Sequence, residues 1–142
     1  MAHAPEPRAL VLLGHGDRSS FNAKLAAAYA EGWRTSGLDV ESIALADLQF
    51  DPVLRTGFKG QQPLEPDLLR VREAIERAKH LVWVFPTYWA SAPALVRGLI
   101  DRLFLPDWAF RYDGGALPTG LLAGRSSRVV LKIDTPEAAE SL

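Results

Sequence analysis

Two short segments of the chain combine residue types suited to holding a phosphate and a flat ring. The first, residues 14–22, follows an apolar run and contains two glycines, and Ser19 or Ser20 can cap the helix that follows. Glycine permits a tight turn, and the free N–H groups that open a helix form an anion site together with nearby hydroxyls. His15 or Arg18 could add positive charge to a bound phosphate. A plain turn with a helix cap explains the same residues, so both interpretations stay open.

The second segment, residues 85–93, places Tyr88 and Trp89 after a strongly apolar run and follows them with small residues. An isoalloxazine ring needs an apolar or aromatic wall against one face and backbone N–H groups at its polar edge. This segment offers both features. The alternative is that Tyr88 and Trp89 fill the top of the core.

Two further stretches have an unusual composition. Residues 103–112 are too apolar for an exposed loop, so they line a pocket for a flat substrate, form a subunit interface, or are buried over a helix end. Residues 47–66 form a long connection rich in proline, glycine and glutamine. Such long connections inside a compact domain are uncommon and often functional. We interpret this one as a flap near the far end of a cofactor.

Apolar runs and amphipathic segments alternate along the chain. We expect strands at 9–13, 39–45, 81–85 and 128–133, and helices from Ser19 or Ser20 to about 37, at 67–79 and from 93 to about 105. In the first helix the residues at helical spacing are Phe21, Leu25, Ala28 and Gly32; in the second they are Leu68, Val71, Ile75 and Ala78.

This alternation predicts an α/β fold with a parallel sheet, helices on both faces and right-handed crossovers. Two strand orders are compatible with this alternation. In one of them, 2-1-3-4, the first and third strands are neighbours and the chain reverses direction between them. Ligands bind at such a switch point, outside the carboxyl ends of the strands. The two segments described first would then lie side by side and form one cleft.

Length and composition restrict the function classes. The 142 residues suit one domain, residues 1–142, and the 16 Lys and Arg against 17 Asp and Glu give no basic field for nucleic acid. The chain has no cysteine, and His3, His15 and His80 lack metal-ligand spacing, so we expect no metal site. We also expect no signal peptide and no membrane insertion, because no apolar run has the necessary length. A cytoplasmic location fits these features.

Taken together, these motifs resemble those of the NAD(P)H:quinone oxidoreductase (DT-diaphorase-like) family. Residues 15–22 are similar to the phosphate loop of that family, residues 85–98 to its flavin segment, and residues 102–112 to its substrate-pocket stretch. The resemblance implies a flavodoxin-like three-layer αβα sandwich, bound FAD or FMN, and a homodimer. It also implies an enzyme in which NAD(P)H gives a hydride to the flavin and a quinone-like acceptor then takes two electrons.

The resemblance also assigns residues by position. His15, Ser20, Phe21 and Asn22 would hold the cofactor phosphates. The ring would lie against Pro86, Thr87, Tyr88, Trp89, Ala90, Asp134 and Thr135. Trp108, Phe110 and Tyr112 would border the acceptor pocket, from the same or the partner subunit. No residue is assigned as catalytic, since the flavin itself transfers the hydride.

The chain departs from the family pattern near its end. Residues 134–137 read Asp-Thr-Pro-Glu where the family often has a Thr-Thr-Gly-Gly turn. The sequence given shows no counterpart of the fifth strand of the family, which would leave strand 128–133 as an edge. A truncated product, a variant that covers the edge by dimerising and a shortened chain are all open explanations. The departure favours a second hypothesis, a non-catalytic flavin-binding subunit, for instance of a membrane transporter. A one-electron carrier of the flavodoxin type is a weaker third.

Overall fold

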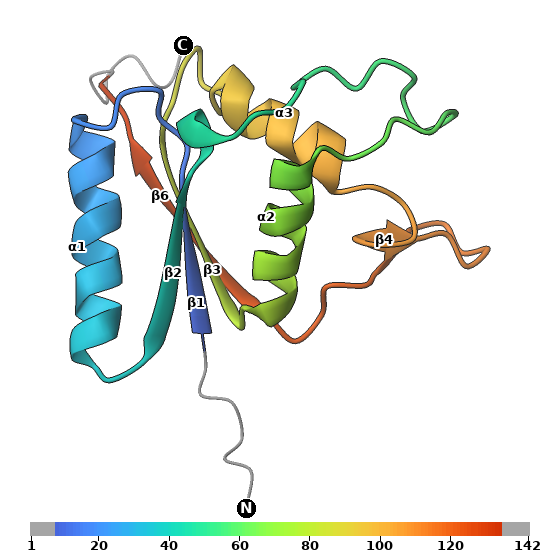
Figure 1. Ribbon diagram of the computed structural model, residues 1–142. Coiled ribbons are helices and arrows are strands. Elements are labelled where there is room, and N and C mark those ends of the chain that lie inside the picture. Colours follow the sequence, from blue (N-terminus) through green and yellow to red (C-terminus); the bar gives the residue numbers. More distant parts are fainter. Residues whose placement is uncertain (1–7, 135–142) are drawn as a thin grey trace, which may run out of the picture.

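The computed structural model describes residues 8–134 and contains one four-stranded parallel sheet (Figure 1). Its order is β2-β1-β3-β6, which confirms the predicted arrangement with β6 as the fourth strand of the sheet. The strands are β1 (Arg8–Leu13), β2 (Asp39–Ala44), β3 (His80–Pro86) and β6 (Ser126–Lys132). Because β1 and β3 are neighbours, the chain reverses direction at their carboxyl ends, as the sequence predicts.

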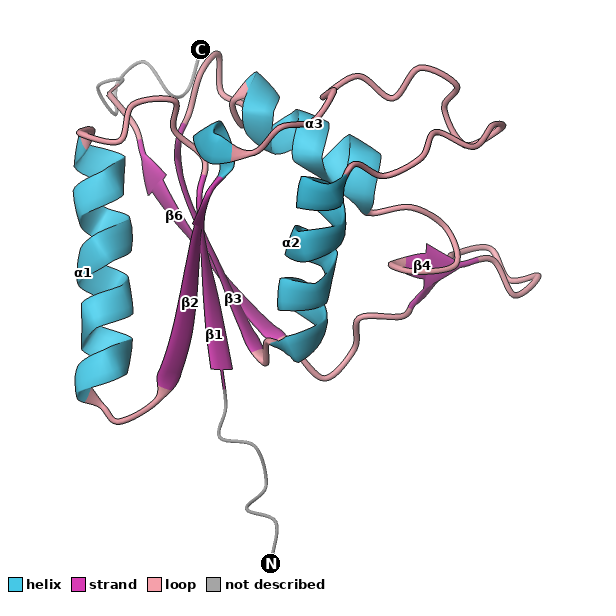
Figure 2. Ribbon diagram, in the orientation of Figure 1, coloured by secondary structure: helices cyan, strands magenta, loops and turns pink. Residues whose placement is uncertain are grey.

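Helices cover both faces of the sheet, so the predicted three-layer architecture is confirmed (Figure 2). One face carries α1 (Phe21–Thr35), and the other carries α2 (Pro66–Arg77) and α3 (Ala94–Leu103). A single 3-10 turn, η1 (Leu45–Asp47), follows β2. Between α3 and β6 lies a small antiparallel ladder of β4 (Phe110–Arg111) and β5 (Thr119–Gly120).

The hydrophobic core confirms one predicted helix face and corrects another. Leu68, Val71, Ile75 and Ala78 are all fully buried, as predicted for the second helix. In α1, however, Phe21, Ala28 and Gly32 are exposed, and the buried positions are Asn22, Ala26 and Ala30. The predicted face was wrong by one or two positions because five of the fifteen residues of this helix are alanine, which blurs its periodicity. Small side chains on the buried face let α1 lie close to β1 and β3.

The long connection 47–66 is tied to α3 by Arg102, whose side chain is fully buried. Its two Nη atoms donate to the Glu65 carboxylate at 3.0 and 2.9 Å, to the Pro63 carbonyl at 2.9 Å and to the Asp51 carbonyl. The hydrogen bonds from Arg102 hold the pKa of Glu65 below its ordinary value. The long connection is therefore a fixed part of the fold.

His80 joins three elements at the amino end of the sheet. Its Nε2 lies 2.9 Å from the Tyr29 hydroxyl of α1, and its Nδ1 lies 2.7 Å from the Ser126 hydroxyl of β6. The Trp33 ring stacks on it with centroids 5.2 Å apart. Burial, together with the nearby charge of Arg128, lowers the pKa of His80 below its usual 6.5. The neutral imidazole is thus the form that the fold favours.

We expect Glu65→Gln to lower the free energy of unfolding by about 2–3 kcal/mol, because it leaves the buried Arg102 charge without its counter-ion. Urea unfolding followed by circular dichroism measures this loss. Glu73→Gln is the matched control, since the exposed Glu73–Arg77 pair should contribute less than about 0.5 kcal/mol. Equal effects of the two substitutions would contradict a structural role for Arg102.

We expect the free energy of unfolding to rise with pH between the pKa of His80 in the folded chain and 6.5, because the unfolded chain binds more protons in that window. His80→Gln should reduce the difference in stability between pH 5.5 and pH 7.5. Comparing variant and wild type at both pH values cancels the effect of the other titrating groups. If the variant shows the same difference in stability between the two pH values as the wild type, protonation of His80 does not destabilise the fold.

Candidate functional site

The two segments singled out in the sequence meet at the carboxyl edge of the sheet. Leu13 and Val84 are register partners, and the Gly14 N–H donates to the Val84 carbonyl at 2.8 Å. A Cβ on Gly14 would overlap the Val96 side chain and lie 3.0 Å from the Cβ of Phe85. Only glycine lets the chain leave β1 this close to β3 and α3. Figure 1 shows the loops that follow β1 and β3 at the same edge.

The first loop is ordered by its own side chains. Asp17 accepts hydrogen bonds from the Ser19 N–H at 2.8 Å and from the Ser19 hydroxyl at 2.7 Å, which lower the pKa of Asp17. The Asp17 N–H donates to His15 Nδ1 at 2.8 Å. A neutral His15 ring with Nδ1 as acceptor carries its proton on Nε2, so Nε2 can donate to a ligand.

The start of α1 holds polar atoms without protein partners. The Ser20 hydroxyl accepts from the Ala23 N–H at 3.2 Å and caps the helix. Within residues 8–134, no partner is found for the N–H groups of Phe21 and Asn22. The Asn22 side chain is 2% exposed, and its Oδ1 lacks a hydrogen-bond partner. A helix start with these groups is suited to an anion or another polar ligand.

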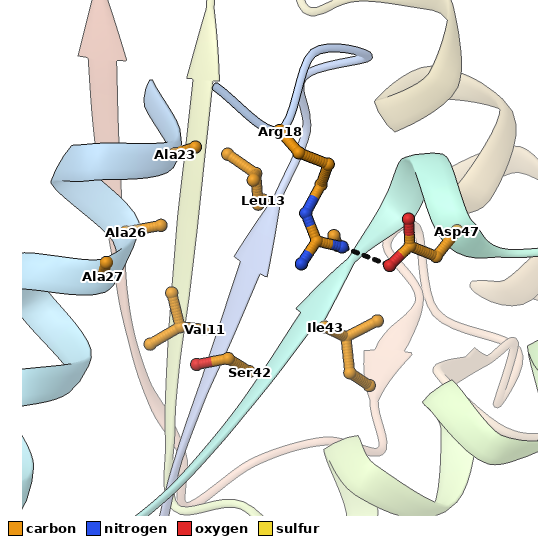
Figure 3. Close-up of a pocket in the computed structure, with 10 residues that line it drawn as sticks. Val11, Leu13, Arg18, Ala23, Ala26, Ala27, Ser42, Ile43 and Asp47 are labelled. Carbon is orange, nitrogen blue, oxygen red and sulfur yellow. Dashed lines mark hydrogen bonds and ion pairs between the residues drawn. The ribbon is translucent and has the colours of Figure 1, made fainter. Parts of the chain in front are cut away.

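Arg18 points away from this helix start. Its guanidinium pairs with Asp47 of η1, beside a cavity of about 340 Å³ between α1 and β2 (Figure 3). The lining includes Val11, Leu13, Ala26 and Ile43. Of the two residues suggested by the sequence to add charge to a phosphate, Arg18 is therefore already paired with a carboxylate.

The second loop contains a strained two-residue turn. Tyr88 and Ser91 exchange backbone hydrogen bonds of 2.9 and 3.1 Å, and Trp89 and Ala90 between them have φ values of 53° and 55°. Residues other than glycine rarely adopt this conformation, and such strain is concentrated at functional sites. The Trp89 side chain is fully exposed and Tyr88 is about half exposed. The alternative in which these two aromatics fill the core is wrong.

The end of β6 lies beside this turn. The Thr87 N–H donates to the Lys132 carbonyl at 3.0 Å, and Lys132 pairs with Asp134. Pro86 is the buried last residue of β3. Thr135 lies outside the described residues. This edge of the sheet therefore carries five consecutive residues predicted for the site, Pro86, Thr87, Tyr88, Trp89 and Ala90. Asp134 follows two residues after Lys132, whose carbonyl accepts from Thr87.

The third segment divides into two parts. Trp108 packs on α2, where its Nε1 donates to Glu76 at 2.7 Å and Arg72 lies 5.0 Å above the ring. Phe110 and Tyr112 instead pack edge to face with centroids 5.7 Å apart.

Phe110 also contacts Phe58 of the long connection, at 6.1 Å between centroids. Sequence reasoning missed Phe58, for which an isolated aromatic in a loop was the only signal. Figure 1 shows β4 well away from the loops after β1 and β3, so one chain does not bring Phe110 to them.

Residues 8–134 show neither a metal site nor a membrane-spanning helix. This range contains no group of three or more histidine, aspartate or glutamate side chains placed to hold a metal ion. In the same range, no helix has the length and hydropathy needed to cross a bilayer. The arrangement at the carboxyl edge is one for binding, with hydrogen-bond donors at the start of α1 and exposed aromatics on the neighbouring turn.

A model of the flavodoxin-like fold matches residues 7–142. The chain is 29% identical over 125 residues to NAD(P)H dehydrogenase [quinone] 1 of Cavia porcellus, which covers 74% of this chain and 46% of that protein. It therefore spans about half the length of that relative.

Two further similarities differ in extent. A 51-residue stretch is 43% identical to the glutathione-regulated potassium-efflux system ancillary protein KefF of Enterobacter sp. (strain 638), covering 36% of this chain and 29% of KefF. The crystal structure of Smu.1420 from Streptococcus mutans UA159 superposes with a TM-score of 0.77 at 27% identity, over 94% of this chain and 72% of the other.

The strained turn makes a prediction about the ligand-free protein. Ala90→Gly should raise the free energy of unfolding by about 0.5–1 kcal/mol. Glycine adopts the left-handed conformation without steric cost, and the larger chain entropy of glycine in the unfolded state offsets only part of this gain. Ala27→Gly on the exposed side of α1 should lower the free energy of unfolding by about 1 kcal/mol. Urea unfolding of both variants tests whether the two changes in the free energy of unfolding have opposite signs. A loss of stability in both would mean that Ala90 is not strained.

Proposed function

Because this chain belongs to the flavodoxin-like fold family, we propose that residues 1–142 form one flavin-binding domain that passes two electrons from NAD(P)H to a quinone-like acceptor. The adjacency of a helix start with free donors and a strained aromatic turn carries this proposal. Similarity to a quinone dehydrogenase supports the choice of donor and acceptor.

The phosphate of FAD or FMN would be held at the start of α1. The donors available there are His15 Nε2, the Ser20 hydroxyl and the N–H groups of Phe21 and Asn22. The Asn22 amide supports the assignment most directly, since it is buried and its Oδ1 lacks a protein partner. Rotating this amide by half a turn exchanges its oxygen and nitrogen, so it can offer either one to the ligand.

The flavin ring would lie against Pro86, Thr87, Tyr88, Trp89 and Ala90, with Asp134 and Thr135 at its border. Within the described part of the chain, the N–H groups of Trp89 and Ala90 have no acceptor, so they can donate to the polar edge of a ring. The left-handed turn fixes these donors before the ligand arrives. A bound flavin would supply the hydride exchange between nicotinamide and acceptor, and the chain would supply position and electrostatics.

The acceptor pocket would be completed in a homodimer. Phe110 and Tyr112 form an aromatic cluster with Phe58 that lies away from the two loops of the same chain. A second copy could bring this cluster to the ring, as the resemblance implies. Trp108, expected at the same pocket, would act by fixing this segment against α2.

A second candidate is a flavin-binding ancillary subunit without turnover of its own. The 43% identity to KefF over 51 residues favours it. For either function we propose a cytoplasmic location, since the chain of 142 residues contains no cysteine.

The purified protein should bind FMN or FAD and show the visible absorbance of a flavin. Asn22→Leu should raise the flavin dissociation constant about tenfold or more, because it removes a buried hydrogen bond to the ligand. Trp33→Phe, at the other end of α1, is the control and should leave binding unchanged. Titration by flavin fluorescence measures both.

Turnover separates the two functions. Bleaching of the bound flavin by NAD(P)H and its return on adding menadione would support the enzyme, whereas tight flavin binding without NAD(P)H oxidation would support the ancillary subunit. A protein that takes up neither FMN nor FAD would exclude both.

A further inference from the structure

The segment between α3 and β6 forms an arm, residues 106–124, that carries Phe110 and Tyr112. The ladder of β4 and β5 lies within this arm, and Figure 2 shows the ladder beside α2 and away from the parallel sheet. A ladder of two strands is by itself marginally stable in water. The position of Phe110 and Tyr112 therefore depends on what holds the two ends of the arm.

Trp108 attaches the first end of the arm to α2. Its indole Nε1 donates to the Glu76 carboxylate at 2.7 Å, and the Arg72 guanidinium lies over the ring at 5.0 Å from its centroid. Arg72 Nε also donates to the same Glu76 oxygen at 3.2 Å. Phe104, which packs against the hydrophobic core, contacts the ring edge to face with centroids 5.7 Å apart. Glu76 thus accepts from Trp108 and also holds Arg72 over the indole ring.

Glu76 makes this contact as a carboxylate. The hydrogen bond from Trp108, followed by that from Arg72, holds the pKa of Glu76 below its ordinary value. An ionised acceptor forms a stronger hydrogen bond than a neutral one. The Glu76 side chain is also about half exposed, so a substitution there removes the contact without opening the core.

Arg125 attaches the second end of the arm to the same helix. Its Nε donates to the Ile75 carbonyl at 3.1 Å, and one of its Nη atoms donates to the Glu76 carbonyl at 3.0 Å. A positive charge beside the carboxyl end of a helix is favoured by the helix dipole. Residues at the end of α2 therefore hold the arm on both sides.

The backbone at Asp107 indicates that the first attachment directs the arm. Asp107 precedes Trp108 and has a φ of 69°, which residues other than glycine rarely adopt. Its N–H donates to the Phe110 carbonyl at 2.8 Å. A strained conformation of this kind persists where surrounding contacts fix it. The contacts of Trp108 therefore bear on the direction in which Phe110 leaves the turn.

We propose that Glu76 is a positioning residue for acceptor binding, which acts through Trp108 to hold the arm where Phe110 and Tyr112 meet the acceptor. The inference rests on the proposed function, because it takes these two aromatic residues as the border of the acceptor pocket. Glu76 itself lies on α2, outside the two loops at the carboxyl edge of the sheet. It would set how well the acceptor binds and leave flavin binding to those loops.

A loosened arm has a defined effect on kinetics. If the arm occupies its place for only a fraction of the time, the apparent affinity for the acceptor falls by that fraction. The flavin would still exchange its hydride once the acceptor is bound. Loss of the Glu76 contact should therefore raise KM for the acceptor and leave kcat unchanged.

Hydrogen exchange measures the arm without any cofactor. The reporters are the N–H groups of Ala109 and Leu121, which form hydrogen bonds of 3.0 and 2.8 Å at the base of the arm. Glu76→Ala should speed their exchange at least about threefold, because it removes a hydrogen bond to a charged group. Glu73→Ala is the matched control, since Glu73 is an exposed carboxylate of the same helix.

Two further variants test whether Glu76 acts through Trp108. Glu76→Gln keeps a side-chain oxygen that can accept from the indole, so it should retain most of the protection from exchange. Trp108→Phe removes the N–H donor and keeps an aromatic ring. In the Trp108→Phe background, Glu76→Ala should have little further effect, because the two substitutions remove the same contact.

Reduction of menadione by the flavin-loaded protein provides the second measurement. Glu76→Ala should raise KM for menadione at least about threefold, with kcat and the flavin dissociation constant unchanged. Glu76→Gln and Glu73→Ala should stay close to the natural chain in all three quantities. A general loss of stability would instead weaken flavin binding as well.

The outcomes separate this inference from the proposed function. Equal exchange in Glu76→Ala and Glu73→Ala would overturn the inference, with or without flavin. Faster exchange in Glu76→Ala with an unchanged KM for menadione would also overturn it and would leave the proposed function standing. A natural chain that does not reduce menadione would overturn the proposed enzyme and the role in acceptor binding together. Faster exchange and a raised KM in Glu76→Ala, absent from Glu73→Ala, would support the inference.

Discussion

The close contact of Gly14 with β3 and α3 is the constraint on which the candidate site depends. The Gly14 N–H bonds to Val84, and the absence of a side chain lets the chain turn against Phe85 and Val96. This contact brings the start of α1 and the Tyr88–Ser91 turn to one edge of the sheet. Any larger residue would push β1 or α3 away, and the two halves of the site would separate.

The helix α3 extends this constraint to the rest of the molecule. It begins directly after the strained turn and carries Arg102, which bonds to Glu65 and to carbonyls of the long connection. Gly98 on the same helix lies so close to Pro52 that a Cβ would overlap its ring. One helix therefore fixes both the turn and the connection, so loosening either is expected to disturb the other.

The sequence predicted the strands of the parallel sheet because apolar runs such as those of β1 and β3 are strong patterns, and the resemblance to a known family then favoured the observed strand order. The adjacency of the two loops follows from that order. The sequence did not predict the buried role of Arg102, since a single arginine in a helix has no periodic signature. The prediction of the buried face of α1 was wrong because alanine occurs on both the buried and the exposed side of this helix, so hydropathy does not distinguish the two sides. The left-handed Trp89 and Ala90 could not be foreseen either, since glycine or asparagine usually occupies such turns. The ladder of β4 and β5 is only two residues long, too short for any alternation to be recognised.

The electrostatics of the first loop indicate how an anion would be held there. Arg18 pairs with Asp47, and the lowered pKa of Asp17 keeps a negative charge in the loop. The remaining donors in this loop and at the helix start are the His15 ring, a hydroxyl and backbone N–H groups. An anion would thus be held mainly by hydrogen bonds and the dipole of α1 rather than by the Arg18 guanidinium. Short-range hydrogen bonds from fixed donors select a ligand by shape, and they are screened less by salt than contacts between exposed charges.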